Sequence, residues 1–147
     1  MIFYNYIAAS FIVRVFLGVL FFAQGFDKVF HVKVQNVIQT FEKQMEDYNV
    51  SSWMIRWAGI YTSYVELICG LMLIIGLLKS VALYLLGIDL LMVCIAFSII
   101  KPMWDIQFVF PRLILLIALL VMPANWDVIS VDYLIGIIEF LQKMRSL

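Results

Sequence analysis

Long runs of apolar residues separated by shorter polar segments dominate the sequence. Four of these runs, at residues 6–26, 56–78, 81–100 and 106–124, approach the roughly 20 residues that a helix needs to cross a bilayer. Backbone groups in lipid must be hydrogen-bonded within the segment, which favours helices. The pattern therefore predicts an all-α integral membrane protein, a four-helix bundle with both chain ends on one side of the membrane.

The two remaining segments are amphipathic. Between residues 28 and 49, apolar side chains recur at helical spacing opposite lysine, glutamine and glutamate, which predicts an amphipathic helix at the interface or capping the bundle. The tail, 128–147, is long enough for a fifth span. Its two acidic residues, Asp132 and Glu139, favour an interfacial helix instead.

Composition and charge indicate which environment and which partners the chain can have. Of 147 residues, 65% are hydrophobic, whereas soluble domains are closer to half apolar. Ten basic residues balance ten acidic ones, so no overall field attracts nucleic acid, and none is expected as a partner. We expect the lipid bilayer to be the main environment of this chain.

The basic residues between the runs suggest an orientation. One side of the predicted bundle carries five of them and the other side three, Lys79, Lys143 and Arg145. Because cytoplasmic loops are enriched in lysine and arginine, this difference favours a multi-pass protein of the bacterial cytoplasmic (inner) membrane with its termini outside.

Four ionisable residues lie inside the runs, one in each: Arg14, Glu66, Asp89 and Arg112. A charge within a membrane is costly and usually faces protein or a water-filled cavity. At about 1.5 Å per residue, Arg14 and Asp89 lie roughly 12 Å from the terminal side, and Glu66 and Arg112 roughly 18 Å. Long arginine side chains can bridge that difference. The spacing predicts one neutral polar cluster at a common depth.

Small residues share the helical faces of these charges. Gly18, Gly25 and Lys28 lie on the face of Arg14, and Gly70 lies on that of Glu66. Small residues let helices approach closely in lipid. Two interpretations stay open: ion pairs that fix helix packing, or a cavity for a proton, a quinone head group or another small polar ligand. The structural interpretation is favoured for Arg112 with Asp89, and the ligand-binding one for Arg14 with Glu66.

Other candidate residues carry weaker signals. His31 is the only histidine. It could carry a proton near neutral pH, but a single histidine argues against a histidine-ligated metal or haem site, and no metal site is predicted. Cys69 and Cys94 point away from the charged faces of their helices, so no disulfide is expected. Two carboxylates near the end of the fourth run are expected to be solvated, Asp127 and Asp132.

The series R-x3-G-x6-G-x2-K from Arg14 to Lys28, the residues Glu66, Gly70 and Gly76, and the triplet Ser130-Val131-Asp132 together resemble the DoxX family of small bacterial membrane proteins. The resemblance extends over about residues 11–132. It implies a four-helix membrane bundle that serves as an oxidoreductase or as a subunit linked to thiosulfate–quinone or redox-defence complexes. Asp89 and Arg112 match no position of that family pattern.

Two hypotheses for function follow. In the first, the chain is a redox-associated subunit that holds quinone or relays protons around Arg14 and Glu66. The sequence shows no recognisable flavin, haem, metal or dithiol site, so a partner subunit would carry the redox centre and no catalytic residue can be named. In the second, it is a non-catalytic scaffold or accessory subunit of a larger membrane complex, which docks through segment 30–48 and the tail. A transporter is less favoured because no inverted repeat is visible.

Overall fold

The chain is predominantly helical over the part that the computed structural model describes, residues 2–48, 50–100 and 106–145. These ranges contain no strand. The all-α prediction is confirmed. The described ranges contain six α-helices: α1 (Ile2–Phe26), α2 (Val34–Gln44), α3 (Ser52–Ile75), α4 (Lys79–Ile100), α5 (Ile106–Val121) and α6 (Val131–Arg145).

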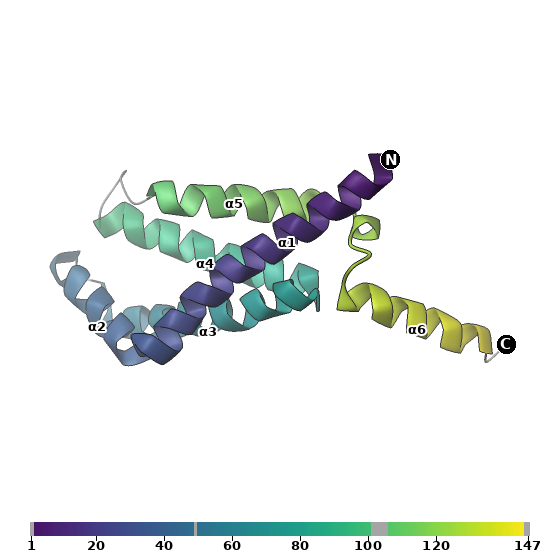
Figure 1. Cartoon of the computed structure of the whole chain (residues 1–147). Helices are drawn as coiled ribbons and strands as arrows, with labels where there is room; N and C mark the ends of the chain where they lie inside the picture. The colour runs from purple at the N-terminus through teal and green to yellow at the C-terminus, as the bar shows by residue number, and fades with distance from the viewer. Residues whose placement is uncertain (1, 49, 101–105, 146–147) are drawn as a thin grey trace.

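Helices α1, α3, α4 and α5 lie alongside one another and form the bundle, with α1 crossing α3 obliquely (Figure 1). Helix α2 lies at one end of the bundle, and α6 projects beyond the opposite end, where the N-terminus also lies. We call these the α2 end and the terminal end.

Within the described ranges, three segments are long and apolar enough to cross a membrane: Tyr4–His31, Ser52–Ile75 and Lys79–Ser98. The fourth predicted span corresponds to α5, whose 16 residues extend only about 24 Å. Its apolar part, Val109–Val121, is shorter than a typical span. The fourth run is therefore helical, but it is not one of the three full-length candidates.

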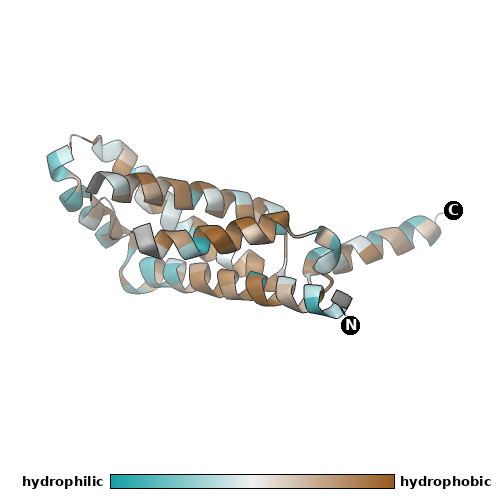
Figure 2. Ribbon diagram, turned by 90° about the horizontal axis from the view of Figure 1, so that it is seen from above, coloured by the Kyte–Doolittle hydropathy of each residue, from teal (hydrophilic) through white to brown (hydrophobic). Residues whose placement is uncertain are grey.

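The bundle is apolar both inside and outside. Its core contains Leu17 and Phe21 of α1, Leu73 of α3, Leu86 of α4 and Leu119 of α5. Large apolar side chains also cover the outside of the same helices, among them Phe16, Ile68, Ile88 and Ile114. Apolar residues predominate along the bundle and polar ones gather toward its ends (Figure 2). A helix that is hydrophobic on all sides suits a lipid environment.

Glycines bring the backbones of α1 and α3 into contact. A Cβ atom on Gly25 would lie 2.6 Å from the Cα of Leu67, and one on Gly70 would lie 2.7 Å from the Cα of Phe22. A Cβ on Gly18 would lie 2.9 Å from the backbone nitrogen of Ile74. These glycines are thus explained by close helix packing, as expected in lipid.

The connections at the two ends have different shapes. At the α2 end, α1 continues into a π-helical turn, η1 (Asp27–His31), and Lys33 then turns the chain with a φ of 69°. Helix α2 packs on α3 through the buried Val37 and through Ile38, which faces Gly59. At the terminal end, Gly76 (φ 73°) stops α3 and α4 begins at Lys79. A left-handed glycine is a common helix C-terminus, and it places the turn before Lys79 rather than at Lys79 and Ser80 as predicted.

We predict that Gly25→Ala lowers the stability of the bundle by about 1–3 kcal/mol, the usual cost of inserting atoms into a closely packed contact. The measurement is thermal unfolding of the detergent-solubilised protein by circular dichroism. Gly136→Ala in α6 is the matched control, because a Cβ there would have no neighbour within 4 Å and alanine is the better helix former. Equal unfolding temperatures for both variants would contradict the close contact of α1 with α3.

Candidate functional site

Arg14 caps the C-terminus of α3. It is only 1% exposed, and its Nη1 donates to the carbonyls of Leu73 (2.6 Å) and Ile74 (3.0 Å). Its Nε donates to Asp127 Oδ1 at 3.0 Å, and its Nη2 donates to the carbonyl of Ile129. The last carbonyls of a helix lack partners within the helix. The guanidinium therefore supplies donors to α3 while Asp127 neutralises its charge.

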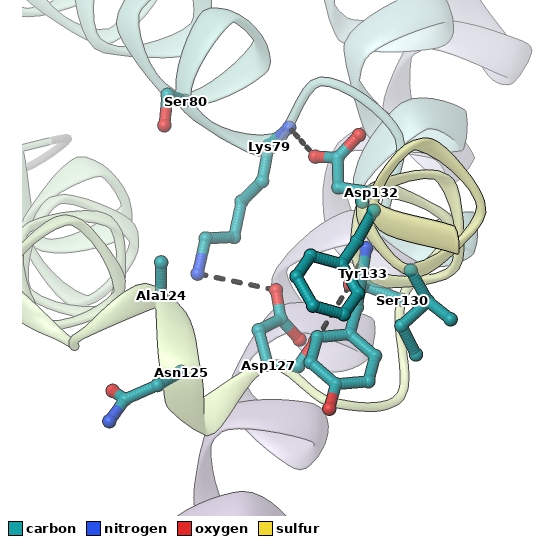
Figure 3. Close-up of a pocket in the computed structure, with 11 residues that line it drawn as sticks. Lys79, Ser80, Ala124, Asn125, Asp127, Ser130, Asp132 and Tyr133 are labelled. Carbon is teal, nitrogen blue, oxygen red and sulfur yellow. Dashed lines mark hydrogen bonds and ion pairs between the residues drawn. The ribbon is translucent and has the colours of Figure 1, made fainter. Parts of the chain in front are cut away.

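Asp127 joins this cation to a second one. Its carboxylate pairs with Lys79 (Figure 3), with Oδ2 3.2 Å from Lys79 Nζ, and Asp127 is only 5% exposed. The expectation that Asp127 is solvated is wrong, because it is buried between Arg14 and Lys79. Asp132 is half-buried and also bonded: its carboxylate accepts the backbone N–H groups of Leu78 (2.8 Å) and Lys79 (3.0 Å). A carboxylate at a helix N-terminus is favourable.

Ser130 and Gly76 complete the same assembly. The Ser130 hydroxyl donates to the Asp127 carbonyl at 2.7 Å and accepts the Tyr133 N–H at 3.2 Å, which makes it the N-cap of α6. The backbone N–H of Asp132 donates to the Gly76 carbonyl at 3.0 Å. A Cβ on Gly76 would lie 2.7 Å from Arg14 Nη1, so only glycine fits. We call Arg14, Gly76, Lys79, Asp127, Ser130 and Asp132 the terminal latch.

Lys28, rather than Arg14, is the partner of Glu66. Lys28 Nζ lies 2.7 Å from Glu66 Oε2 and 3.1 Å from Thr62 Oγ1. The Thr62 hydroxyl lies 3.4 Å from Glu66 Oε1. Glu66 and Thr62 are buried, while the Lys28 side chain is 23% exposed. The π-helical turn η1, at the end of α1, carries this lysine.

Asp89 belongs to the same region of the bundle. It interacts electrostatically with Glu66, Lys28 and Arg112. Arg112 is half-buried on α5, and within the described part of the chain no ion pair of 4.0 Å or less includes it. We call Lys28, Thr62, Glu66 and Asp89 the mid-bundle cluster. The four charges predicted at one depth are therefore divided, with Arg14 in the terminal latch and Glu66, Asp89 and Arg112 in mid-bundle.

The other predicted site residues have different roles. His31 is exposed and lies 3.3 Å from Asp27 through its Nδ1. Gly18, Gly25 and Gly70 lie where α1 and α3 make close backbone contact. Cys69 and Cys94 are both free cysteines. Within the described residues, no group of three or more histidine, cysteine, aspartate or glutamate side chains is placed to hold a metal ion.

A groove of about 490 Å³ lies beside the terminal latch. Its polar wall includes Lys79, Asn125 and Asp127 (Figure 3), and its apolar wall includes Tyr133 and Phe140 of α6. Sequence reasoning did not assign Lys79 and Asp127 to a site. The available signal was the pattern Asp-x-x-Ser-x-Asp at residues 127–132, since these residue types are favoured at turns and helix N-termini.

We predict that Asp127→Asn destabilises the protein by about 3–5 kcal/mol, because it leaves Arg14 and Lys79 without a buried counter-charge. Chemical or thermal unfolding in detergent measures the change. Asp27→Asn removes the same charge from an exposed pair, and it is expected to cost no more than about 1 kcal/mol. A latch that contributes little would show equal losses in the two variants.

Comparison with known families shows to which family the chain belongs. The family model described as methylamine utilisation protein MauE matches residues 6–104, about two-thirds of the chain. No curated protein and no solved structure matches it. The resemblance to DoxX is wrong: its key residues, Arg14, Gly18 and Gly25, are explained by helix capping and close packing, which are not specific to one family. The matched segment contains α1 to α4 and ends before Asp127. The chain belongs to the family of the methylamine utilisation protein MauE.

Proposed function

We propose that this chain is a non-catalytic accessory subunit of a membrane-bound system for methylamine utilisation. The family description supports the metabolic context. The apolar, membrane-like bundle supports a role within the bilayer. The observation that carries the accessory role is the way in which the terminal latch holds α6 at the end of the bundle.

Helix α6 presents an uncovered apolar face. Leu134, Ile138, Phe140, Leu141 and Met144 are between 54% and 61% exposed. Asp132, Gly136, Glu139 and Lys143 follow one another at helical spacing on another face. An isolated helix of 15 residues is marginal in water and gains most of its stability from packing. The apolar face of α6 therefore suits the hydrophobic groove of a partner subunit.

The latch fixes the base of this helix. Asp132 binds the start of α4 through its side chain and the end of α3 through its backbone N–H. Helix α6 consequently leaves the bundle in a set direction, beyond the terminal end (Figure 1). A recognition helix that is held in place before binding loses less conformational freedom when it binds.

An orientation with α6 outside the cytoplasm completes this proposal. The α2 end carries Lys33, Lys43 and Arg56 in addition to Lys28, and such a basic end favours the cytoplasm in a bacterial inner membrane. The partner of α6 would then be an extracytoplasmic subunit or domain of the same system.

We predict that alkaline phosphatase fused after Leu147 is active in bacterial cells and that green fluorescent protein fused there is dark, because both report an extracytoplasmic C-terminus. The same reporters inserted after Gln44, at the end of α2, should give the reverse pattern. A fluorescent C-terminal fusion with inactive phosphatase would place α6 in the cytoplasm and contradict the orientation.

We also predict that deletion of the gene from its host abolishes growth on methylamine and leaves growth on ammonium and a sugar unchanged. A plasmid copy with Leu134→Asp, which places a charge on the apolar face of α6, should accumulate in the membrane but fail to restore growth. Gln142→Asp adds the same charge at an exposed polar position and should restore it. Normal methylamine growth of the deletion strain would refute the proposed system, and rescue by Leu134→Asp would refute docking through α6.

A further inference from the structure

Asp89 is a buried carboxylate for which the described part of the chain places no donor within hydrogen-bonding distance. It lies ten residues after Lys79, the first residue of α4, which places it about 15 Å from the terminal end of that helix. It is 0% exposed, and among the described residues neither of its carboxylate oxygens has a hydrogen-bond partner. Buried charges in proteins are ordinarily paired or hydrogen-bonded, because desolvation without compensation is strongly unfavourable. Asp89 thus needs a ligand that removes its charge.

The neighbouring cations, Lys28 and Arg112, do not neutralise Asp89 through a direct ion pair within the described residues. Lys28 Nζ is bound to Glu66 and Thr62, and Arg112 is half-buried and forms no ion pair of 4.0 Å or less within the described residues. The Glu66 carboxylate, held by Lys28, adds negative charge beside Asp89. The polar or titratable groups that face Asp89 from adjacent elements are Lys28 of η1, Tyr61, Thr62 and Glu66 of α3, and Arg112 of α5, with the thiol of Cys69 nearby.

We propose that Asp89 is an intramembrane proton-binding site, in which the carboxyl group holds a proton between α3 and α4 and exchanges it with the α2 end through Glu66, Thr62 and Lys28. Hydronium at the α2 end supplies the proton and is left as water: each group on the route gains one bond to hydrogen as it gives another up, so the net change is one O–H bond broken in hydronium and one formed on Asp89. The neutral carboxyl can then donate toward the Thr62 hydroxyl or toward Glu66. This site is independent of the accessory role proposed for α6.

Among the described residues, the hydroxyl, amine and carboxylate groups that lead from Asp89 to an exposed side chain lie toward the α2 end. The Lys28 side chain is partly exposed at the α2 end and contacts both Glu66 and Thr62, and Thr62 also interacts with Asp89. Toward the terminal end, α4 places the fully buried Ala82, Leu83 and Leu86 in the core. Because apolar core offers no hydrogen bonds for proton transfer, we infer that Asp89 exchanges protons with the α2 end alone.

Infrared spectroscopy of the protein in lipid vesicles tests the site. At neutral pH the wild type should show a carboxylic-acid C=O band that shifts in deuterated water, and Asp89→Asn should lose that band while keeping its helical amide signal. Asp27→Asn, which changes an exposed carboxylate, should keep it. An identical acid band in wild type and Asp89→Asn, or no acid band in the wild type, would overturn the proposal.

Two further variants keep the test decisive if Asp89→Asn does not fold. Thr62→Val retains the carboxyl and should shift the frequency of the acid band by removing a hydrogen-bond partner; an unshifted band would overturn the placement of the proton beside Thr62. Lys28→Met should slow deuterium exchange of the band, and unchanged exchange would overturn the proposed route. A wild type that lacks the band but is stabilised by sodium over choline would show a cation ligand instead and refute proton binding.

Discussion

The contact on which the terminal end depends is the buried guanidinium of Arg14 between the last carbonyls of α3 and the carboxylate of Asp127. The planar fork of arginine presents several donors in fixed directions, whereas a lysine ammonium is a compact point charge. The Arg14 side chain can therefore cap α3 and form an ion pair with Asp127 at the same time. Through Asp127, Lys79 and Asp132 the same contact fixes where α4 begins and how α6 leaves the bundle.

Hydropathy was sufficient to predict the four helices of the bundle, because a long apolar run in lipid has few alternatives to a helix. The pairing of charges could not be predicted from Cα depth. Side chains on a helix lean toward its N-terminus. Arg14 thus reaches back to the terminal end, Lys28 reaches back into the bundle, and Glu66 on the antiparallel α3 leans toward Lys28. Adding this direction to the depth estimate separates Arg14 from the pair of Lys28 and Glu66, although it does not assign Asp89, which leans in the same direction as Arg14.

The burial of Asp127 could not be predicted from the sequence, for a different reason. It lies outside every apolar run, where a carboxylate is usually solvated. Its burial arises from tertiary structure, because the linker after α5 folds against Arg14 and Lys79. The family resemblance failed for a related reason. Glycines that bring α1 onto α3 and an arginine that caps a helix are general solutions to packing in lipid, so their spacing describes a bundle better than it identifies a family.

The two polar regions differ in how fully they are satisfied. In the terminal latch each guanidinium nitrogen of Arg14 has a partner, so its contribution to stability explains its presence. Asp89 has no such explanation. A leucine at this position would pack beside Leu86 and Leu90 without the cost of desolvating a carboxyl group, and apolar replacements of buried charges are often neutral or stabilising. Places where a sequence departs from its own packing rules tend to be functional. Stability alone therefore gives no reason for an acid in the middle of α4, whereas proton binding does.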